Sequence, residues 1–190
     1  AIVASCADDN PPQIEKSSEL VSPRLLMDVS TESGQSPLTG ILTIMPCKAG
    51  TSIYYGNYIN RKLTPFYGYY QVKDGAFYND GVNRELSLPA GLYNMIYWGT
   101  PKYEEPIYAH PLMRDPVYLG EDMSRQHFSL FKMEADTTYY PVFDLVHAVQ
   151  PANIGSEDLK ASLKRVVTGL KVIIKDKNNG ILSSSIDSMV

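Results

Sequence analysis

Short runs of alternating apolar and polar residues, separated by turn-forming residues, recur along most of this chain and constrain its fold more than any other feature. In residues 66–80, an Asp-Gly pair separates two such runs, which is a strong local signal for a β-hairpin. Residues 84–99 follow the same hairpin logic around a Pro-Ala-Gly turn. After that turn, Tyr93, Met95 and Tyr97 fall on one face of a strand. Short strands at this spacing predict an all-β fold, and specifically an antiparallel β-sandwich.

The other predicted strands follow the same pattern, and one segment is ambiguous. The strands are predicted at residues 24–30, 40–46, 52–59 (a strand or an ordered loop), 127–134, 138–149 and the hairpin 169–186. In residues 156–167, Leu159, Leu163 and Val166 recur at helical spacing behind Ser156, which could cap a helix. The same residues also fit a linker that runs into a strand, so both alternatives stay open.

The pattern divides the chain into three segments. Residues 1–19 precede the first predicted strand, and residues 7–19 among them are polar and contain proline, which is typical of a flexible tether. Residues 20–155 are predicted to form an N-terminal β-sandwich domain. Residues 156–190 are predicted to form a linker and the first hairpin of a second, incomplete β-sandwich. The boundary is placed where residues 150–155 interrupt the alternation with Pro, Asn and Gly.

Composition and motif spacing argue against several classes of function. The formal net charge is -4, and Lys and Arg are not clustered, so a nucleic-acid partner is not expected. The three histidines are scattered without ligands at metal spacing, and no phosphate-binding glycine motif is present. Asp144 and His147 would face opposite sides of a strand, which weakens a catalytic dyad. We therefore expect no enzymatic activity, no cofactor and no metal site.

The cysteine at position 6 suggests a lipid anchor. Residues 3–6 read Val-Ala-Ser-Cys, which resembles the lipobox of bacterial lipoproteins, where the peptide is cut before an acylated cysteine. A polar, proline-containing tether follows it. We therefore predict lipidation at Cys6, although four such residues also fit an ordinary apolar strand end with a buried cysteine. Cys47 then has no disulfide partner and is predicted to be a small buried hydrophobic residue.

The chain is rich in tyrosine, with fourteen in all, and many of them lie between residues 54 and 78. Aromatic side chains of this kind can stack on sugars or anchor a protein partner. The candidate contacts to a partner or a glycan are Tyr54, Tyr55, Tyr67 and Tyr69. The alternative is that these residues form part of the sandwich core, with their hydroxyl groups at its rim.

Together with Cys6, three segments resemble a known family. "LSLPAGLYNMIYWG", "YYPVFDLVHAV" and "LKRVVTGLKVIIKD" are similar to segments of the Bacteroidetes-type fimbrillins, and most similar to those of their lipid-anchored minor subunits, the fimbrial anchor proteins. The resemblance implies transthyretin-like β-sandwich domains in tandem, and Cys6 as the site of lipid attachment. It also implies an outer-membrane lipoprotein at the cell surface that joins other fimbrial subunits by strand donation.

Two further expectations follow from this resemblance. In stalk subunits of the family, an arginine-specific protease removes a first strand and opens the acceptor groove. Arg24 precedes the first predicted strand of this chain and is therefore a candidate processing site. A surface glycan-binding lipoprotein, using the tyrosine-rich segment, is the alternative function.

Overall fold

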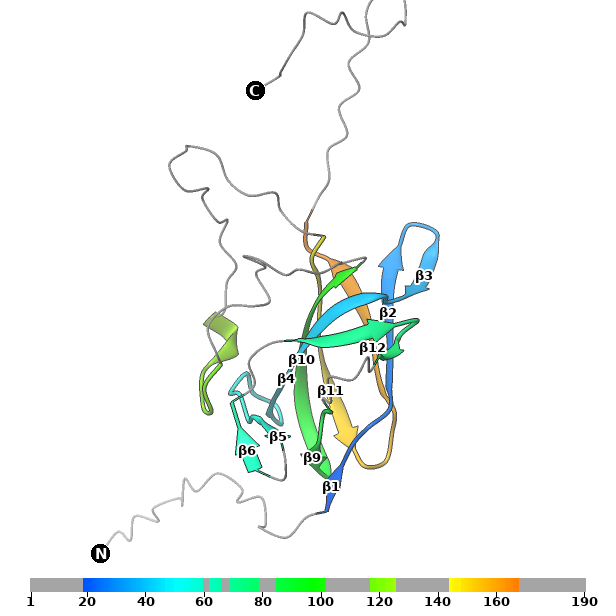
Figure 1. The fold of residues 1–190 in the computed structure, drawn as a ribbon. Helices are drawn as coiled ribbons and strands as arrows, with labels where there is room; N and C mark the ends of the chain where they lie inside the picture. Colours follow the sequence, from blue (N-terminus) through cyan, green and yellow to red (C-terminus); the bar gives the residue numbers. More distant parts are fainter. Residues whose placement is uncertain are drawn as a thin grey trace, which may run out of the picture.

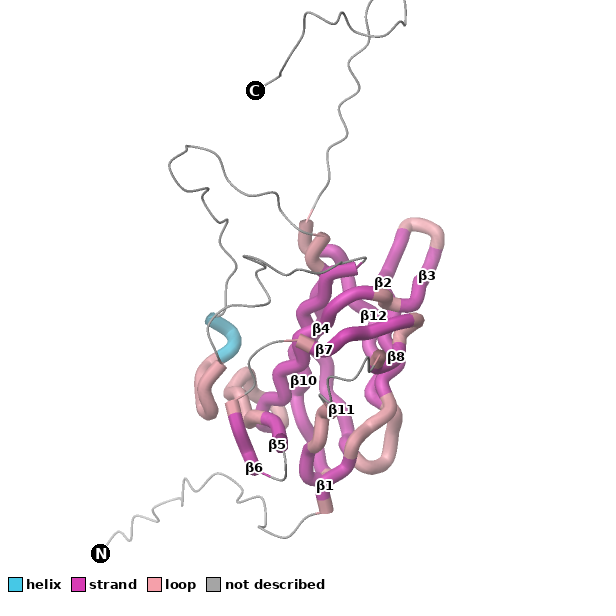
Figure 2. Tube along the Cα trace, in the orientation of Figure 1, coloured by secondary structure: helices cyan, strands magenta, loops and turns pink. Residues whose placement is uncertain are grey.

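The computed structural model describes residues 19–59, 62–65, 69–78, 85–101, 117–125 and 144–167, and within these ranges the chain is built almost entirely of β-strands (Figures 1 and 2). The strands are β1 (Leu20–Val21), β2 (Leu25–Thr31), β3 (Gly34–Pro37), β4 (Gly40–Lys48), β5 (Asn57–Ile59), β6 (Lys62–Thr64), β7 (Tyr70–Lys73), β8 (Ala76–Phe77), β9 (Leu88–Pro89), β10 (Gly91–Pro101), β11 (Val146–Ile154) and β12 (Leu159–Arg165). A single turn of 3₁₀ helix, η2 (Met123–Arg125), is the only helix in the described ranges. The all-β class predicted from the alternation is confirmed.

Eight of the strands form one curled sheet, in the order β3-β2-β12-β11-β10-β4-β7-β8. Two small sheets, β1-β9 and β5-β6, lie beside it. The pairs in the large sheet are antiparallel except for β12 and β2, which run parallel. The expectation of a wholly antiparallel sandwich is therefore wrong at this one pair, and the sheet is mixed.

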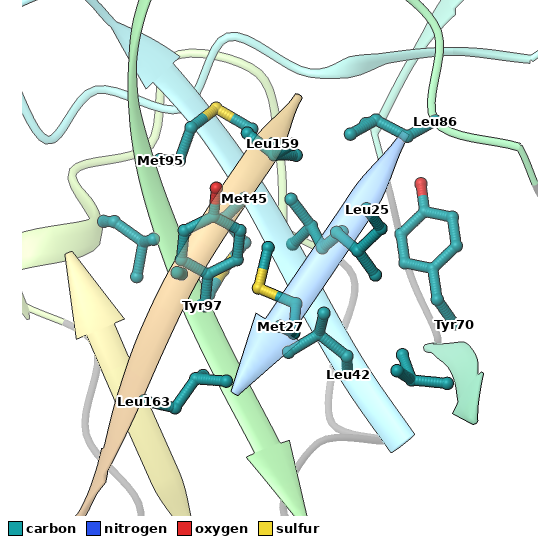
Figure 3. Packing of buried hydrophobic residues seen from close by; sticks show 14 of the residues in the cluster. Leu25, Met27, Leu42, Met45, Tyr70, Leu86, Met95, Tyr97, Leu159 and Leu163 are labelled. Atoms are coloured by element: carbon teal, nitrogen blue, oxygen red, sulfur yellow. The ribbon is translucent and has the colours of Figure 1, made fainter. Parts of the chain in front are cut away.

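The curl of the sheet brings β2 and β12 across β4 and β10, and the buried side chains lie between these layers (Figure 3). On β10, Tyr93, Met95 and Tyr97 point inward as predicted, with exposed fractions of 3 % or less. β4 differs from the other strands because residues 41–47 are all buried. A strand whose consecutive residues are all buried is covered on both faces, so β4 lies in the interior of the described fold.

The hairpin predicted from the Asp-Gly pair is confirmed, and it closes one flank of the sheet. Asp74 and Gly75 join β7 to β8 with φ angles of 51° and 81°, the left-handed values of a tight hairpin turn. Two backbone hydrogen bonds connect this turn to β2 and to the residue after β3, and a third joins that residue to β2. The donors and acceptors are Met27 N to Gly75 O (2.9 Å), Gly75 N to Leu38 O (2.8 Å) and Leu38 N to Met27 O (2.9 Å). We call this the closed flank.

The opposite flank, between β11 and β12, is joined only at one corner. Register pairs there are limited to Val146↔Arg165 and His147↔Lys164. Beyond them β11 continues along β10 to Ile154, while no described strand pairs with the second edge of its residues 148–154. One side chain bridges the gap, because Gln150 Nε2 donates to the carbonyl oxygen of Lys160. We call this the open flank.

The large sheet continues across the boundary predicted at residues 150–155, and the division into two domains stays a prediction. Residues 150–155 were expected to interrupt the alternation, but β11 runs through Pro151 to Ile154. Proline is tolerated in the strand because the β11–β12 ladder has already ended at His147, and an edge position needs no N–H group. The sheet also extends past residue 155, where the first domain was predicted to end, because β12 lies between β2 and β11.

The ambiguous segment 156–167 is a strand, so the helical alternative is wrong. Leu159 and Leu163 fit a period of four and a period of two equally well, and Ala161, buried between them, decides for the strand. The predicted tether at residues 1–19 and the second domain stay predictions, because residues 1–18 and 168–190 lie outside the described ranges. The same holds for the strands predicted at residues 127–134 and 169–186.

The second predicted hairpin, over residues 84–99, does not form. β9 pairs with β1 through Leu20↔Pro89 and Val21↔Leu88, while β10 pairs with β4 and β11. Both edges of β10 are therefore taken by long partners, which leaves no place for β9 beside it. The strands expected at residues 24–30 and 40–46 are confirmed as β2 and β4, and residues 52–59 contain β5 together with two isolated bridges.

Candidate assembly surface

The described tyrosines of the candidate contact set lie mostly inside the molecule. Tyr54 is 1 % exposed and bridges Cys47 at the end of β4. Tyr55 is half-buried, and its ring meets the edge of Tyr93 with centroids 5.4 Å apart. Burial raises the pKa of the Tyr55 hydroxyl well above its ordinary value. Tyr54 therefore offers no exposed face, and Tyr55 offers only part of one.

The other two members of that set do not complete an exposed platform within the described residues. Tyr69 is half-buried and packs against the small cluster of Ile41 and Leu145. Tyr67 lies outside the described residues. Contact with a glycan or a partner through these tyrosines stays a prediction, and the core alternative describes Tyr54, Tyr55 and Tyr69 better.

The structure describes only one of the two cysteines. Cys6 lies outside the described residues. Cys47 is fully buried, as predicted, and burial, with a smaller contribution from Asp122, raises the pKa of its thiol to about 12. A thiol with such a pKa carries almost no thiolate at neutral pH, so Cys47 is a packing residue rather than a nucleophile. The described residues contain no cluster of His, Cys, Asp or Glu that could hold a metal ion.

The sequence did not indicate the structural role of Asn57. Asn57 is 1 % exposed, and its Nδ2 donates to the hydroxyl of Tyr70 at 2.8 Å. Its Oδ1 accepts from the backbone N–H groups of Tyr58 (2.9 Å) and Ser87 (3.2 Å). A single side chain thus connects β5 to β7 and to the segment before β9. Sequence patterns could not have shown this, because an asparagine beside a glycine is typical of an exposed turn.

The candidate processing site is engaged in the parallel strand pair. The guanidinium group of Arg24 binds both carboxylate oxygens of Asp158, at 2.6 Å and 3.2 Å, and this hydrogen bonding lowers the pKa of Asp158. The carbonyl oxygen of Arg24 accepts from Leu159 N at 2.8 Å. Cleavage after Arg24 would therefore require the start of β2 to separate from β12, and processing at this residue stays a prediction.

The corner of the open flank contains an aromatic stack and an ion pair. The rings of Trp98 and His147 lie with centroids 4.0 Å apart, and burial lowers the pKa of His147. Asp144 binds the guanidinium of Arg165 through both oxygens, at 2.9 Å and 3.0 Å. Among the described residues, the carboxylate of Asp144 is therefore directed to Arg165.

The edges of the large sheet differ in how far they are protected. β3 is four residues long, fully exposed, and ends at Pro37, and β8 has only two residues. Edges as short as these give a further strand few backbone groups to pair with. The second edge of β11 is longer, spans residues 148–154, and is bridged only by Gln150 among the described residues. Val149, on this strand, is 51 % exposed. The open flank is therefore the candidate assembly surface.

Comparison with known families decides the classification. The family of fimbrillin-A associated anchor proteins Mfa1 and Mfa2 matches residues 20–190. The chain belongs to this family. Comparisons with curated proteins and with solved structures gave no match. The resemblance to fimbrial anchor proteins seen in the sequence motifs is thereby confirmed, and it associates this anchor-family protein with fimbriae, with their subunits and with the cell surface.

The match to the fimbrillin-A associated anchor family begins where the described fold begins. Residue 20 is the first residue of both the match and β1. Cys6 lies ahead of this point, in the segment predicted to be a tether. Among the described residues, no helix has the length and hydropathy of a membrane span.

Proposed function

We propose that this protein is a non-enzymatic outer-membrane lipoprotein, held to the membrane by a lipid on Cys6, that acts as a fimbrial anchor or minor fimbrial subunit in adhesion structures at the cell surface. The observation that carries the proposal is the family match over residues 20–190. The lipobox-like residues 3–6 lie ahead of the matched region, which suits a lipid attached through a short tether. More than one acyl chain is needed for stable anchoring, and the lipid on a lipoprotein cysteine supplies several.

The proposed contact with the next fimbrial subunit is an extended segment added along the open flank. Unpaired N–H and C=O groups at a sheet edge bind an incoming strand through its main chain, and neighbouring side chains give specificity. Apart from Pro151, which has no N–H group, residues 148–154 offer such groups along their second edge, and Gln150 is the one described side chain that an incoming strand would displace. Val149, which is 51 % exposed, offers an apolar neighbour to the incoming strand.

The lipid anchor is tested by mass spectrometry of the protein purified from its native host. The mature chain is expected to begin at Cys6 and to carry the mass of the lipid, and Cys6→Ser is expected to abolish both processing and membrane association. Cys47→Ala is the matched control, because that thiol is buried and its loss should leave the protein in the membrane fraction. A bare thiol at Cys6 in the native protein would overturn the proposal.

The docking edge is tested by co-purification of fimbrial subunits with two variants of equal exposure. Val149→Asp places a charge on the open flank, whereas Val166→Asp changes a residue that is 52 % exposed and lies beyond the end of β12. Val149→Asp is expected to reduce the recovered subunits about fivefold, which corresponds to about 1 kcal/mol of binding free energy. Equal recovery with the two variants would exclude β11 as the docking edge while leaving the lipid anchor untouched.

A further inference from the structure

The parallel pair β2–β12 joins the first long strand of the described chain to its last strand. Five register pairs connect them, from Leu159↔Leu25 to Leu163↔Val29. The chain enters this pair just after β1 and leaves it just after Arg165. We propose that the β2–β12 pair is a mechanical clamp, which carries tension applied between the N-terminal side of β2 and the C-terminal side of β12.

The direction of the strands is what makes the pair suitable for this task. Because β2 and β12 are parallel, a force that enters at the start of β2 and leaves at the end of β12 slides the two strands past each other along their axes. Such shear loads all the interstrand hydrogen bonds together, so they must break in one step. A force applied to the same ends of both strands would open the bonds one at a time. Resistance to forced unfolding is set by the unfolding barrier, which is higher when many bonds must break together.

Side-chain bonds reinforce the pair at both of its ends. At the start, Arg24 binds Asp158 through two hydrogen bonds, and its carbonyl accepts from Leu159 N. Toward the far end, the hydroxyl groups of Ser30 and Ser162 lie 2.9 Å apart. These bonds cross from one strand to the other and would be strained by sliding. Exposed ion pairs contribute little to equilibrium stability, so their main effect here is on the barrier to shear.

The inner face of the pair keeps water away from the interstrand bonds. The buried residues on that face are Leu25, Met27 and Val29 of β2 and Leu159, Ala161 and Leu163 of β12. Figure 3 shows the side chains of Leu25, Met27, Leu159 and Leu163 among the packed core residues. Water can therefore reach and replace these hydrogen bonds only from the outer face, which slows rupture under load.

The inference rests on the proposed function in one respect, because an anchor is loaded between its membrane end and its fimbrial partner. A load from the membrane enters at the start of β2, and β11, the proposed docking edge, is joined to the C-terminal end of β12 by Val146↔Arg165 and His147↔Lys164. The test is independent of that function, since it measures the strength of the isolated chain. Single molecules of the full chain are pulled through cysteine handles, with Cys6→Ser in every variant. Cys47 stays in place because it is fully buried and its thiol is protected from the coupling reagent.

Two handle geometries load the same strand pair in different directions. Glu19→Cys with Val166→Cys applies shear, whereas Glu19→Cys with Glu157→Cys pulls both strands from their starting ends; all three positions are exposed. We expect the unfolding force in the shear geometry to be several-fold higher. The shared handle at Glu19 makes the contribution of the β1–β9 pair the same in both measurements. Equal forces in the two geometries would overturn the proposal.

Arginine variants test the reinforcement separately. Arg24→Ala removes the ion pair across β2 and β12, and Arg165→Ala removes a similar two-bond pair, with Asp144, that lies outside this interface. Arg24→Ala is expected to lower the shear force, while Arg165→Ala leaves it unchanged, and neither shifts the urea midpoint appreciably. An equal effect of the two variants on the shear force, or no effect of Arg24→Ala, would show that the ion pair does not reinforce the clamp.

Discussion

The two flanks of the curled sheet are held in different ways. The closed flank is joined by three backbone hydrogen bonds among Met27, Leu38 and Gly75, each 2.8–2.9 Å long. The open flank is joined by two register pairs at one corner and by the side chain of Gln150. Backbone bonds at a flank fix the distance between strands, whereas one long side chain can rotate away. The closed flank is therefore expected to be the more rigid of the two, and the open flank is where the proposed docking would occur.

The largest expected effect on the free energy of unfolding comes from changing Gly75, which lies in the turn at the closed flank. Gly75→Ala forces an alanine into a φ of 81° and places its Cβ 3.0 Å from the carbonyl oxygen of Met27. We expect it to lower the free energy of unfolding by about 2 kcal/mol, from the left-handed backbone and the close contact together. Thermal unfolding should show a decrease in Tm of several degrees.

The matched change on the open flank is Gln150→Ala, which removes the one side-chain bridge. It should lower the free energy of unfolding by only about 0.5 kcal/mol, since the bond is exposed and water can replace it. If Gln150→Ala destabilised the protein as much as Gly75→Ala, the two flanks would be equally rigid and the comparison would fail.

A smaller difference is expected between two tyrosines that face the core from β10. The hydroxyl of Tyr93 donates to the carbonyl of Pro89 at 3.0 Å, whereas the buried hydroxyl of Tyr97 has no partner among the described residues. Tyr93→Phe should therefore lower the free energy of unfolding by about 1 kcal/mol, because it leaves a buried carbonyl unpaired. Tyr97→Phe should be neutral or stabilising, because it removes a buried polar group without breaking a bond. Urea unfolding measures both, and a Tyr97→Phe variant as unstable as Tyr93→Phe would contradict the assignment.

The smallest expected effect concerns pH at the corner where the open flank converges. Burial lowers the pKa of His147 in the folded state, so folding disfavours its protonated form. The contribution of neutral His147 to the free energy of unfolding is fully present above the unfolded pKa of about 6.5. It is lost as the pH falls from there toward the lowered pKa of the folded state. Trp98, the one tryptophan of the chain, stacks on this ring, so the fluorescence of the folded protein should decrease as the pH falls through the lowered pKa of His147. A fluorescence titration that is unchanged in His147→Gln would show that the signal does not come from this histidine.

The sequence was most informative about features that depend only on residues close together along the chain. The Asp74-Gly75 turn forms as predicted, because left-handed φ angles are accessible to this dipeptide whatever surrounds it. The inward face of β10 is also as predicted, because alternation along one strand fixes which side chains share a face. The sequence was less informative about the tyrosines, since composition counts aromatic residues but does not show which of them are buried.

The sequence by itself determined the all-β class, the position of most described strands and the membership of the fimbrial anchor family. The tertiary structure alone decided which strands are neighbours: β9 lies beside β1 rather than β10, and β12 lies parallel to β2. The reason is that the alternation of apolar and polar residues shows which face of a strand is buried. The backbone hydrogen-bonding groups at its edges, however, can pair with any other strand. Partners more than a hundred residues apart, such as Leu25 and Leu159, are selected only when the whole core packs.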